Sequence, residues 1–289
     1  MALPHFHQVL LDTISPEDKV WSYTVPNLPN EEICNKAGLM KACALVTDAH
    51  GQHLDLSLAK IPESRAICEY PLHRFVHLSC ANFRLHSPDG QPASIKESSS
   101  YLVRFLQAGI AINGCHYHFF GHSNSQLKCK SCFLLAGKKD EVRRIVDGLG
   151  DFSKITSTAK KAKRIGLLFS TAHSSLDVEA QRCEDIADIE GNGFIFTDGC
   201  GLISPKLVQI VTRRHPITFR NQRYRPSVLQ IRHRGYKGVV MIEPLIKPPI
   251  WLRLRKSMRK FSDVKNMGFS TIEYSKVSQI CCIHGHGDI

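Results

Sequence analysis

Residues 228–242 read VLQIRHRGYKGVVMI, two apolar runs on either side of a glycine. The runs 228–232 and 238–242 are rich in β-branched and aliphatic side chains, which is typical of strands. Gly235 between them permits the positive φ that a tight turn needs. We therefore predict two strands joined at Gly235, and the rest of the chain is interpreted outward from this pair.

The positive charge of the chain is concentrated around these strands. The 289 residues include 38 Lys and Arg and 26 Asp and Glu, a formal net charge of +12. Residues 213–260 hold 14 of the basic residues and one acid, Glu243, so the remaining 24 basic and 25 acidic residues sum to −1. A solvated cationic face is the alternative interpretation, but such faces usually mix both signs. The concentration favours an anionic partner.

A third predicted strand, 251–255, belongs to the same basic stretch. It alternates Arg253 and Arg255 with leucines, which predicts one cationic face. Guanidinium groups bind phosphate bidentately, and aromatic rings such as those of Tyr236 and Trp251 stack on bases. This combination is typical of proteins that bind nucleic acid or nucleoside triphosphates, but it does not distinguish a polymerase from a binding module. The basic residues on or beside the predicted strands are Arg232, Lys237, Arg253, Arg255, Lys256, Arg259 and Lys260.

Upstream, the pattern alternates between helices and strands. Ser204-Pro205 is expected to open a short apolar helix, and Asn113-Gly114 is a tight-turn signal between two strands. The resulting fold class is α+β, ending in a barrel-like β domain. The other predicted elements are a helical patch at 31–44, strands at 75–78, 110–112, 116–120, 132–135 and 194–196, helices at 96–108 and 140–149, and a basic linker at 160–164.

Composition excludes several classes of protein. With 43% hydrophobic residues the chain can bury real cores, so wholesale disorder is excluded. No apolar run approaches the roughly 18 residues of a membrane span, and no signal-peptide pattern is present, so no membrane partner is expected. Eleven scattered cysteines suit reduced thiols better than a disulfide framework. We expect an intracellular protein and leave nucleus or cytoplasm open.

Two further kinds of site were weighed. Cys129 and Cys132, with Cys115, His116 and His118 upstream, are conceivable zinc ligands, but their spacing is not that of a standard finger and buried core cysteines are favoured. The tail containing Cys281, Cys282, His284 and His286 is a weaker candidate. The carboxylates available for two-metal chemistry are Asp185, Asp188, Glu190 and Asp198. The first three are irregularly spaced in a polar stretch and are interpreted as solvated or capping residues.

Several motifs in order resemble the eukaryotic cellular RNA-dependent RNA polymerases of RNA silencing, with a fungal character. The resemblance rests on 74–76 (RFV), 112–114 (ING), 119–132 (FFGHSNSQLKCKSC), 196–204 (FTDGCGLIS), 226–240, 254–261 (LRKSMRKF) and 272–278 (IEYSKVS). It covers about residues 65 to 278, which makes it far more specific than any single motif.

The resemblance implies a core of two double-psi β-barrels that copies an RNA template from ribonucleoside triphosphates with Mg²⁺, and it admits other silencing proteins as partners. Arg232, Lys237 and Lys260 match the family's basic active-site positions, so a catalytic role in neutralising triphosphate charge is expected. Gly235 and Gly238 are expected at close backbone approaches or tight turns, and Asp198-Gly199 at a turn. The residues expected to bind phosphate or nucleic acid are Arg225, Arg234, Arg253, Arg255, Lys256 and Arg259.

The domain organisation follows from the same resemblance. We predict a turn-rich segment (1–64), an α+β region (65–190), a partial first double-psi β-barrel (191–280) and a divergent tail (281–289). The family's metal-binding Asp-x-Asp-Gly-Asp loop is expected downstream of Lys260 but is not found in the sequence. We therefore expect a polymerase fragment that binds no metal and is inactive by itself. The alternatives are a non-catalytic RNA-binding protein that uses residues 213–260, and a zinc-dependent nucleic-acid module.

Overall fold

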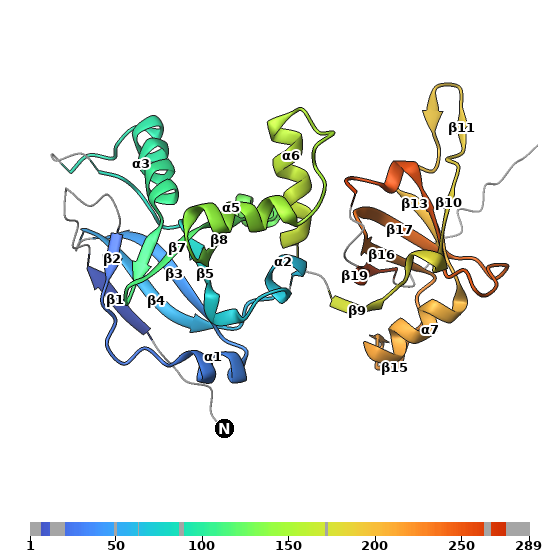
Figure 1. Cartoon of the computed structure of the whole chain (residues 1–289), viewed down its shortest axis with the longest axis horizontal. Helices are drawn as coiled ribbons and strands as arrows, with labels where there is room; N and C mark the ends of the chain where they lie inside the picture. Colours follow the sequence, from blue (N-terminus) through green and yellow to red (C-terminus); the bar gives the residue numbers. More distant parts are fainter. Residues whose placement is uncertain are drawn as a thin grey trace, which may run out of the picture. The chain divides into compact units, whose positions relative to one another are not determined.

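A computed structural model describes residues 7–11, 21–48, 51–62, 64–86, 90–170, 173–262 and 267–275. The chain splits into two compact units, Met1–Ala172 and His173–Ile289. Each unit has its own sheet (Figure 1). The domain boundaries expected after residues 64, 190 and 280 stay predictions, although strands from 7–59 share one sheet with strands from 75–136.

The first unit is built on an eight-stranded sheet in the order β1-β4-β3-β5-β8-β7-β6-β2. The pairs β3–β5 and β2–β6 are parallel, and the other neighbours are antiparallel. The strands at 75–78, 110–112, 116–120 and 132–135 are confirmed. The strands are β1 (His7–Leu11), β2 (Trp21–Tyr23), β3 (Met40–Asp48), β4 (Gly51–Ala59), β5 (Phe75–Ser79), β6 (Ile110–Ile112), β7 (Cys115–Gly121) and β8 (Ser131–Ala136).

The helices of the first unit confirm the predictions at 96–108 and 140–149. The longest begins with a capping box, in which Ser94 accepts from the Glu97 amide and Glu97 accepts from the Ser94 amide. The helices are α1 (Glu31–Ala37), α2 (Arg65–Cys68), α3 (Ile95–Ala108), α4 (Asn124–Lys128), α5 (Lys139–Gly148) and α6 (Thr158–Ile165), with 3-10 turns at Leu72–Arg74 and Gly166–Phe169.

Two predictions in this unit are wrong. The helical patch at 31–44 ends at Ala37, because Gly38 adopts φ +66° and closes the helix, and Met40–Asp48 is a strand. The expected basic linker at 160–164 is helix α6, which begins where the Ser157 side chain accepts from the Lys160 amide. In both places a capping residue decides where the helix ends or begins, whereas the prediction relied on apolar pattern or charge.

The second unit is a seven-stranded sheet in the order β10-β18-β13-β17-β16-β19-β9, with α7 packed against it. The pairs β13–β17 and β10–β18 are parallel. The predicted strands at 228–232, 238–242 and 251–255 and the helix after Ser204 are confirmed. The elements are β9 (His173–Asp177), β10 (Cys183–Ile186), β13 (Cys200–Ile203), α7 (Pro205–Arg214), β16 (Val228–His233), β17 (Tyr236–Ile242), β18 (Leu252–Arg255) and β19 (Gly268–Tyr274).

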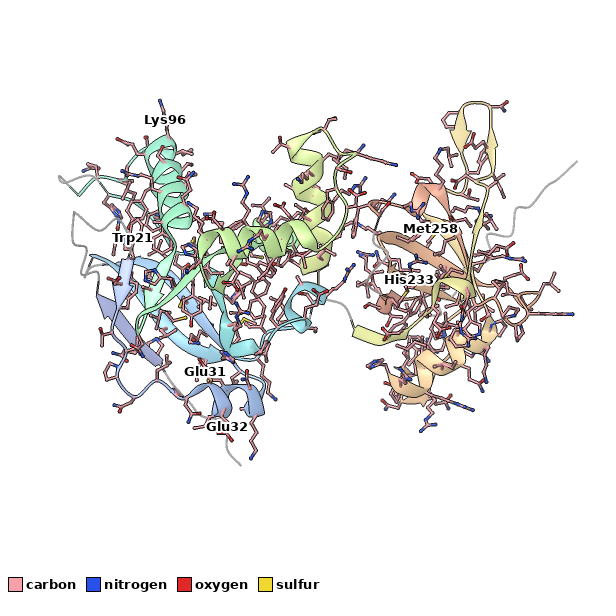
Figure 2. All side chains as sticks on the ribbon, in the orientation of Figure 1. Trp21, Glu31, Glu32, Lys96, His233 and Met258 are labelled. Carbon is pink, nitrogen blue, oxygen red and sulfur yellow. The ribbon has the colours of Figure 1, made fainter. Side chains whose placement is uncertain are left out.

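Short elements connect the strands of this sheet. Four of them are short strands that pair into two small hairpins. The prediction of a strand at 194–196 is confirmed at Phe194–Ile195. Figure 2 shows Met258 and His233 in this unit, and both side chains are buried. The short elements are β11 (Glu190–Gly191), β12 (Phe194–Ile195), β14 (Thr218–Phe219), β15 (Gln222–Arg223) and 3-10 turns at Ala180–Arg182 and Lys256–Met258.

Each unit carries one of the two tryptophans. Trp21 packs on the core of the first unit, 4.7 Å from the ring of Phe105. Trp251 packs on the core of the second unit, and the Arg182 guanidinium lies 4.0 Å from its ring centre. Indole fluorescence can therefore follow each unit separately.

Candidate nucleic-acid interface

The end of the β16–β17 hairpin places two cations side by side. Arg232 and Lys237 are directly opposite in the antiparallel register, so their side chains share one face of the sheet. Like charges in this position destabilise a sheet. The turn between them has positive φ at Arg234 (44°) and Gly235 (81°), as a two-residue type I′ turn requires. The hairpin thus concentrates positive charge at a cost in stability, as is typical of an anion-binding surface.

Arg232 is the most desolvated of these cations. Burial lowers the pKa of its guanidinium to about 10, so the group is still protonated at neutral pH. Its Nη1 donates to the Ile231 carbonyl at 2.9 Å, whereas its Nε is buried and has no hydrogen-bond partner among the described residues. A buried cation with an unsatisfied N–H gains most when an anion approaches. Arg232 is therefore the strongest candidate for a phosphate contact.

The segment 256–261 adds further cations next to the turn. The Lys260 amide donates to the Gly235 carbonyl at 2.9 Å, which fixes this segment against the hairpin. The Lys260 ammonium donates to the Ser257 carbonyl. The exposed Arg259 lies over the Tyr236 ring, with its guanidinium carbon 5.3 Å from the ring centre. The predicted site residues that the fold gathers at this end of the hairpin are Arg232, Arg234, Lys237, Arg259 and Lys260, and the exposed Lys256 begins the 3-10 turn that leads to them.

Two glycines allow this close assembly. A Cβ at Gly235, whose φ is also positive, would fall inside van der Waals contact of the Phe261 carbonyl oxygen. A Cβ at Gly238 would meet the Gly199 carbonyl oxygen in the same way. The expectation of close backbone approach at Gly235 and Gly238 is confirmed, and Gly199, with φ +72°, sits in the expected turn.

One carboxylate ties the basic segment to the loop before β13. Asp188 accepts from the Ser257 hydroxyl at 2.6 Å, from the Ser257 amide at 3.0 Å and from the Thr197 hydroxyl at 3.0 Å. The Ser257 hydroxyl in turn accepts from the Gly199 amide at 3.1 Å. The hydrogen bond from Ser257 is the main reason that the pKa of Asp188 is lowered. We call Asp188, Thr197, Gly199 and Ser257 the clasp.

The sequence did not predict the clasp. The expectation that Asp188 is a solvated or capping residue is consistent with its bond from the Ser257 amide in the 3-10 turn Lys256–Met258, but it does not include the link to the Thr197 hydroxyl. Asp185 is exposed yet accepts from the Tyr236 hydroxyl at 2.7 Å, and burial together with this contact raises the pKa of Tyr236 to about 12. Glu190 is exposed, as expected, and Asp198 is exposed in the turn expected for it. The signal in the sequence that could have indicated the clasp is Ser257, a hydroxyl residue within a basic stretch.

Arg255 does not lie on a cationic face. Its Nε donates to the Ala187 carbonyl at 3.0 Å and its Nη1 to the Cys200 carbonyl at 3.0 Å, and the residue is 9% exposed. The prediction of a cationic face on the strand 251–255 is therefore wrong at Arg255, because the curled sheet turns this side chain toward backbone acceptors. Arg255 ties β18 to β13 and to the residue that follows β10, and both edges of its guanidinium group are partly engaged by these carbonyls.

Arg225 and Arg253 lie away from the hairpin turn. Arg225 Nη2 donates to the Pro205 carbonyl at 2.7 Å, close to the start of α7. Arg253 Nε pairs with Glu184 at 2.7 Å. The register places Arg253 opposite Leu202, level with the far end of β17. The predicted phosphate contacts of these two arginines stay predictions.

The described residues show no metal centre. No three His, Cys, Asp or Glu side chains among them gather so as to hold an ion. Burial raises the pKa of Cys132 to about 12, while Cys115 and Cys129 are exposed, so these cysteines do not form the zinc site that was weighed. The candidate ligands Cys281, Cys282, His284 and His286 lie outside the described residues. The single carboxylate of the clasp, Asp188, is engaged in hydrogen bonds and does not by itself form a Mg²⁺ site.

None of the helices in the described ranges is long and apolar enough to cross a membrane.

Comparison with known proteins gives a consistent match. A family model described as RNA dependent RNA polymerase matches residues 62–283. The chain is 34% identical over 210 residues to "Probable RNA-dependent RNA polymerase 1" of Oryza sativa subsp. japonica, covering 70% of this chain and 27% of that protein. It is 35% identical over 176 residues to "RNA-dependent RNA polymerase 1" of Arabidopsis thaliana, covering 59% of this chain and 15% of that protein.

A solved structure shares the fold. The RNA dependent RNA polymerase QDE-1 from Thielavia terrestris superposes with a TM-score of 0.66 at 17% sequence identity, covering 82% of this chain and 28% of that one. The predicted fold class, α+β with part of a double-psi β-barrel of the polymerase type, is confirmed by this match. The chain spans about a quarter or less of the length of the curated relatives quoted above.

Proposed function

The chain belongs to the RNA-dependent RNA polymerase family, and from that premise we propose that its second unit forms the cationic wall of a polymerase active site. The whole core would synthesise complementary RNA on an RNA template for gene silencing. The observation that carries the proposal is the placement of Arg232 opposite Lys237 at the hairpin end, with Lys260 fixed against the same turn.

The chemistry of nucleotidyl transfer explains why cations are needed there. Negative charge develops on the transferred phosphoryl group and on the departing pyrophosphate, and preorganised positive groups stabilise it. We assign this role to Arg232, Lys237 and Lys260. Arg232 is held partly desolvated, which strengthens its interaction with phosphate. The clasp holds the start of the segment that carries Lys260, and the Lys260 amide donates to the Gly235 carbonyl at the turn.

Mg²⁺ is proposed for the complete enzyme, where it would supply further neutralisation of phosphate charge. Because no group of carboxylates in the described ranges fits the ion, we derive no step through it. The proposed ligands of the second unit are an RNA template and ribonucleoside triphosphates. The intracellular location, with nucleus or cytoplasm open, and other silencing proteins as partners stay proposals.

A complementation assay tests the proposed activity. The chain would be mixed with the remaining segment of a relative that carries the aspartate loop, and synthesis of complementary RNA would be measured on a single-stranded template. We expect synthesis in the mixture and its loss with Lys237→Ala, whereas Arg223→Ala, an exposed basic residue of β15, is the control with the same change of charge. RNA binding that persists without synthesis in the mixture would instead favour the non-catalytic RNA-binding protein.

A further inference from the structure

A groove in the first unit lies far from the basic segment in sequence. It is a cavity of about 450 Å³, open to solvent, between helices α3 and α5 and above strand β7. Both helices pack on β7 (Figure 1). Its apolar lining comes from Val103, Leu106, Phe119 and Val146, together with the buried Phe120.

The spacing of the lining residues shows that each helix presents one face to the groove. On α3 the lining residues are Val103, Leu106 and Gln107, and on α5 they are Lys139, Arg143 and Val146. Separations of three and four place side chains on one face of a helix. The groove therefore has one wall from α3, one wall from α5 and a floor of strand residues.

Large apolar side chains are left in water at this groove. Val103 is 52% exposed and Phe119 is 41% exposed. A single exposed apolar residue is ordinary, but neighbouring ones that line a concave surface mark an interaction site.

Two cations on α5 face the same groove without a carboxylate of their own. Lys139 and Arg143 form no ion pair among the described residues, although Asp147 is one turn from Arg143. Of the other acids on α5, Glu141 pairs with Arg74 at 3.2 Å, and the exposed Asp140 forms no ion pair among the described residues. An unpaired Lys and Arg beside an apolar floor complement a partner that is apolar on one side and acidic on its flank.

The floor of the groove is kept uncharged. Burial, and then the neighbouring positive charges of His116 and Lys139, lower the pKa of His118. Its Nδ1 is buried without a hydrogen-bond partner among the described residues. The positive charge is therefore confined to the α5 side of the groove.

We propose that this groove binds an amphipathic helix of a partner protein, with apolar side chains at helical spacing in the groove and carboxylates beside Lys139 and Arg143. An amphipathic helix can lie in a groove between two helices, where its side chains at positions i, i+3, i+4 and i+7 act as anchors. RNA fits less well, because the walls are aliphatic and Phe119 is the one aromatic ring exposed to stack on a base. This partner surface is independent of the proposed polymerase site.

A peptide selection tests this proposal with the full chain. A displayed library of peptides of about 18 residues, long enough for five helical turns, would be selected on the protein and counter-selected on the Phe119→Glu variant. We expect the enriched peptides to carry apolar residues at helical spacing and at least one acidic residue on the flank. A synthetic copy of one such peptide is then the probe.

Variants of the groove define the expected result. Val103→Glu, Phe119→Glu and Arg143→Glu should each weaken the probe by about tenfold or more, whereas Lys96→Glu, exposed at the outer end of α3 (Figure 2), should not. Replacing the acidic residues of the probe with lysine should restore binding to Arg143→Glu. Since Val103 and Phe119 are both on the surface, circular dichroism melting checks that these variants stay folded.

Three outcomes would overturn the proposal. One is that the enriched peptides bind the wild type and the Phe119→Glu variant equally well. Another is a probe whose binding does not change with charge at Arg143. The third is a single-stranded RNA that binds the folded protein and is weakened by Val103→Glu when no peptide is, which would assign the groove to RNA.

Discussion

Asp188 and Ser257 are 69 residues apart in sequence, and their side-chain oxygens lie 2.6 Å from each other. The same carboxylate also accepts from the Ser257 amide, so it orients both the backbone and the side chain of the basic segment. The Lys260 ammonium donates to the carbonyl of that same serine. A cation proposed to contact phosphate is thus linked through Ser257 to the carboxylate of Asp188.

Loosening the clasp should weaken anion binding without removing a positive charge. We expect Ser257→Ala to lower the affinity for single-stranded RNA several-fold and to lower the Tm of the second unit, because Asp188 and the Gly199 amide both lose a partner. Fluorescence anisotropy with labelled RNA measures the first effect. Ser257→Thr, which keeps the hydroxyl, should restore binding, and equal affinities for Ala and Thr variants would contradict the role of the clasp.

The clasp should also make the stability of the second unit depend on pH in the acidic range. The hydrogen bonds from Ser257 lower the pKa of Asp188 in the folded protein, so the stabilisation is complete above the unfolded value of about 3.9. It is lost as the pH falls through the lowered folded pKa, because protonation then removes the acceptor. The difference in Tm between the wild type and Asp188→Asn should shrink as the pH is lowered below about 4.

Asp198→Asn is the control for this experiment, since Asp198 is exposed and is not part of the clasp. Its Tm difference from the wild type should stay small over the same pH range. A difference for Asp188→Asn that is constant down to the lowest pH measured would argue against a hydrogen-bonded carboxylate at this position.

The salt dependence of RNA binding should identify the cations that contact phosphate. For a single strand, each contact contributes about 0.7 to the slope of log K against log salt concentration. We expect Lys237→Ala to reduce the slope by about that amount, whereas Arg223→Ala, an equal change of net charge on exposed β15, should leave it nearly unchanged. Equal slopes for the two variants would show that the basic segment acts as a diffuse charge.

The two close-approach glycines should not accept a side chain. Gly238→Ala forces a methyl group against the Gly199 carbonyl, and overpacking of this kind costs about 1–3 kcal/mol. Gly148→Ala in the first unit is the control, because nothing lies within 4 Å of a Cβ there and no positive φ is involved, and it is followed through Trp21 in a Trp251→Phe background. Urea unfolding followed through Trp251 in a Trp21→Phe background isolates the second unit; an unchanged midpoint for Gly238→Ala would contradict the close approach.

Local signals predicted much of this fold. Asn113-Gly114 adopts the positive φ angles of the expected turn, Ser204-Pro205 opens α7, and the strands on either side of Gly235 form as expected. Each of these features is decided by residues close together in sequence. The limit of the helix that begins at Glu31 was missed because Gly38 closes it before the apolar pattern ends.

The candidate site was predicted only in part, because the sequence indicates which residues are basic but not where their side chains point. The basic residues were found from their concentration and from family motifs, but the sequence does not show which of them face outward. Arg255 points to backbone carbonyls and Arg253 pairs with Glu184, which depends on the parallel pairing of β10 with β18. Long-range pairing of this kind has no signal in a single sequence, and the same is true of the clasp.

The facing cations of β16 and β17 also couple ligand binding to folding. Bringing Arg232 and Lys237 together opposes the pairing of their strands, and a polyanion bound between them offsets that repulsion. RNA or inorganic triphosphate would then act as a folding ligand for this part of the chain, raising the melting temperature reported by Trp251 and leaving that reported by Trp21 where it was.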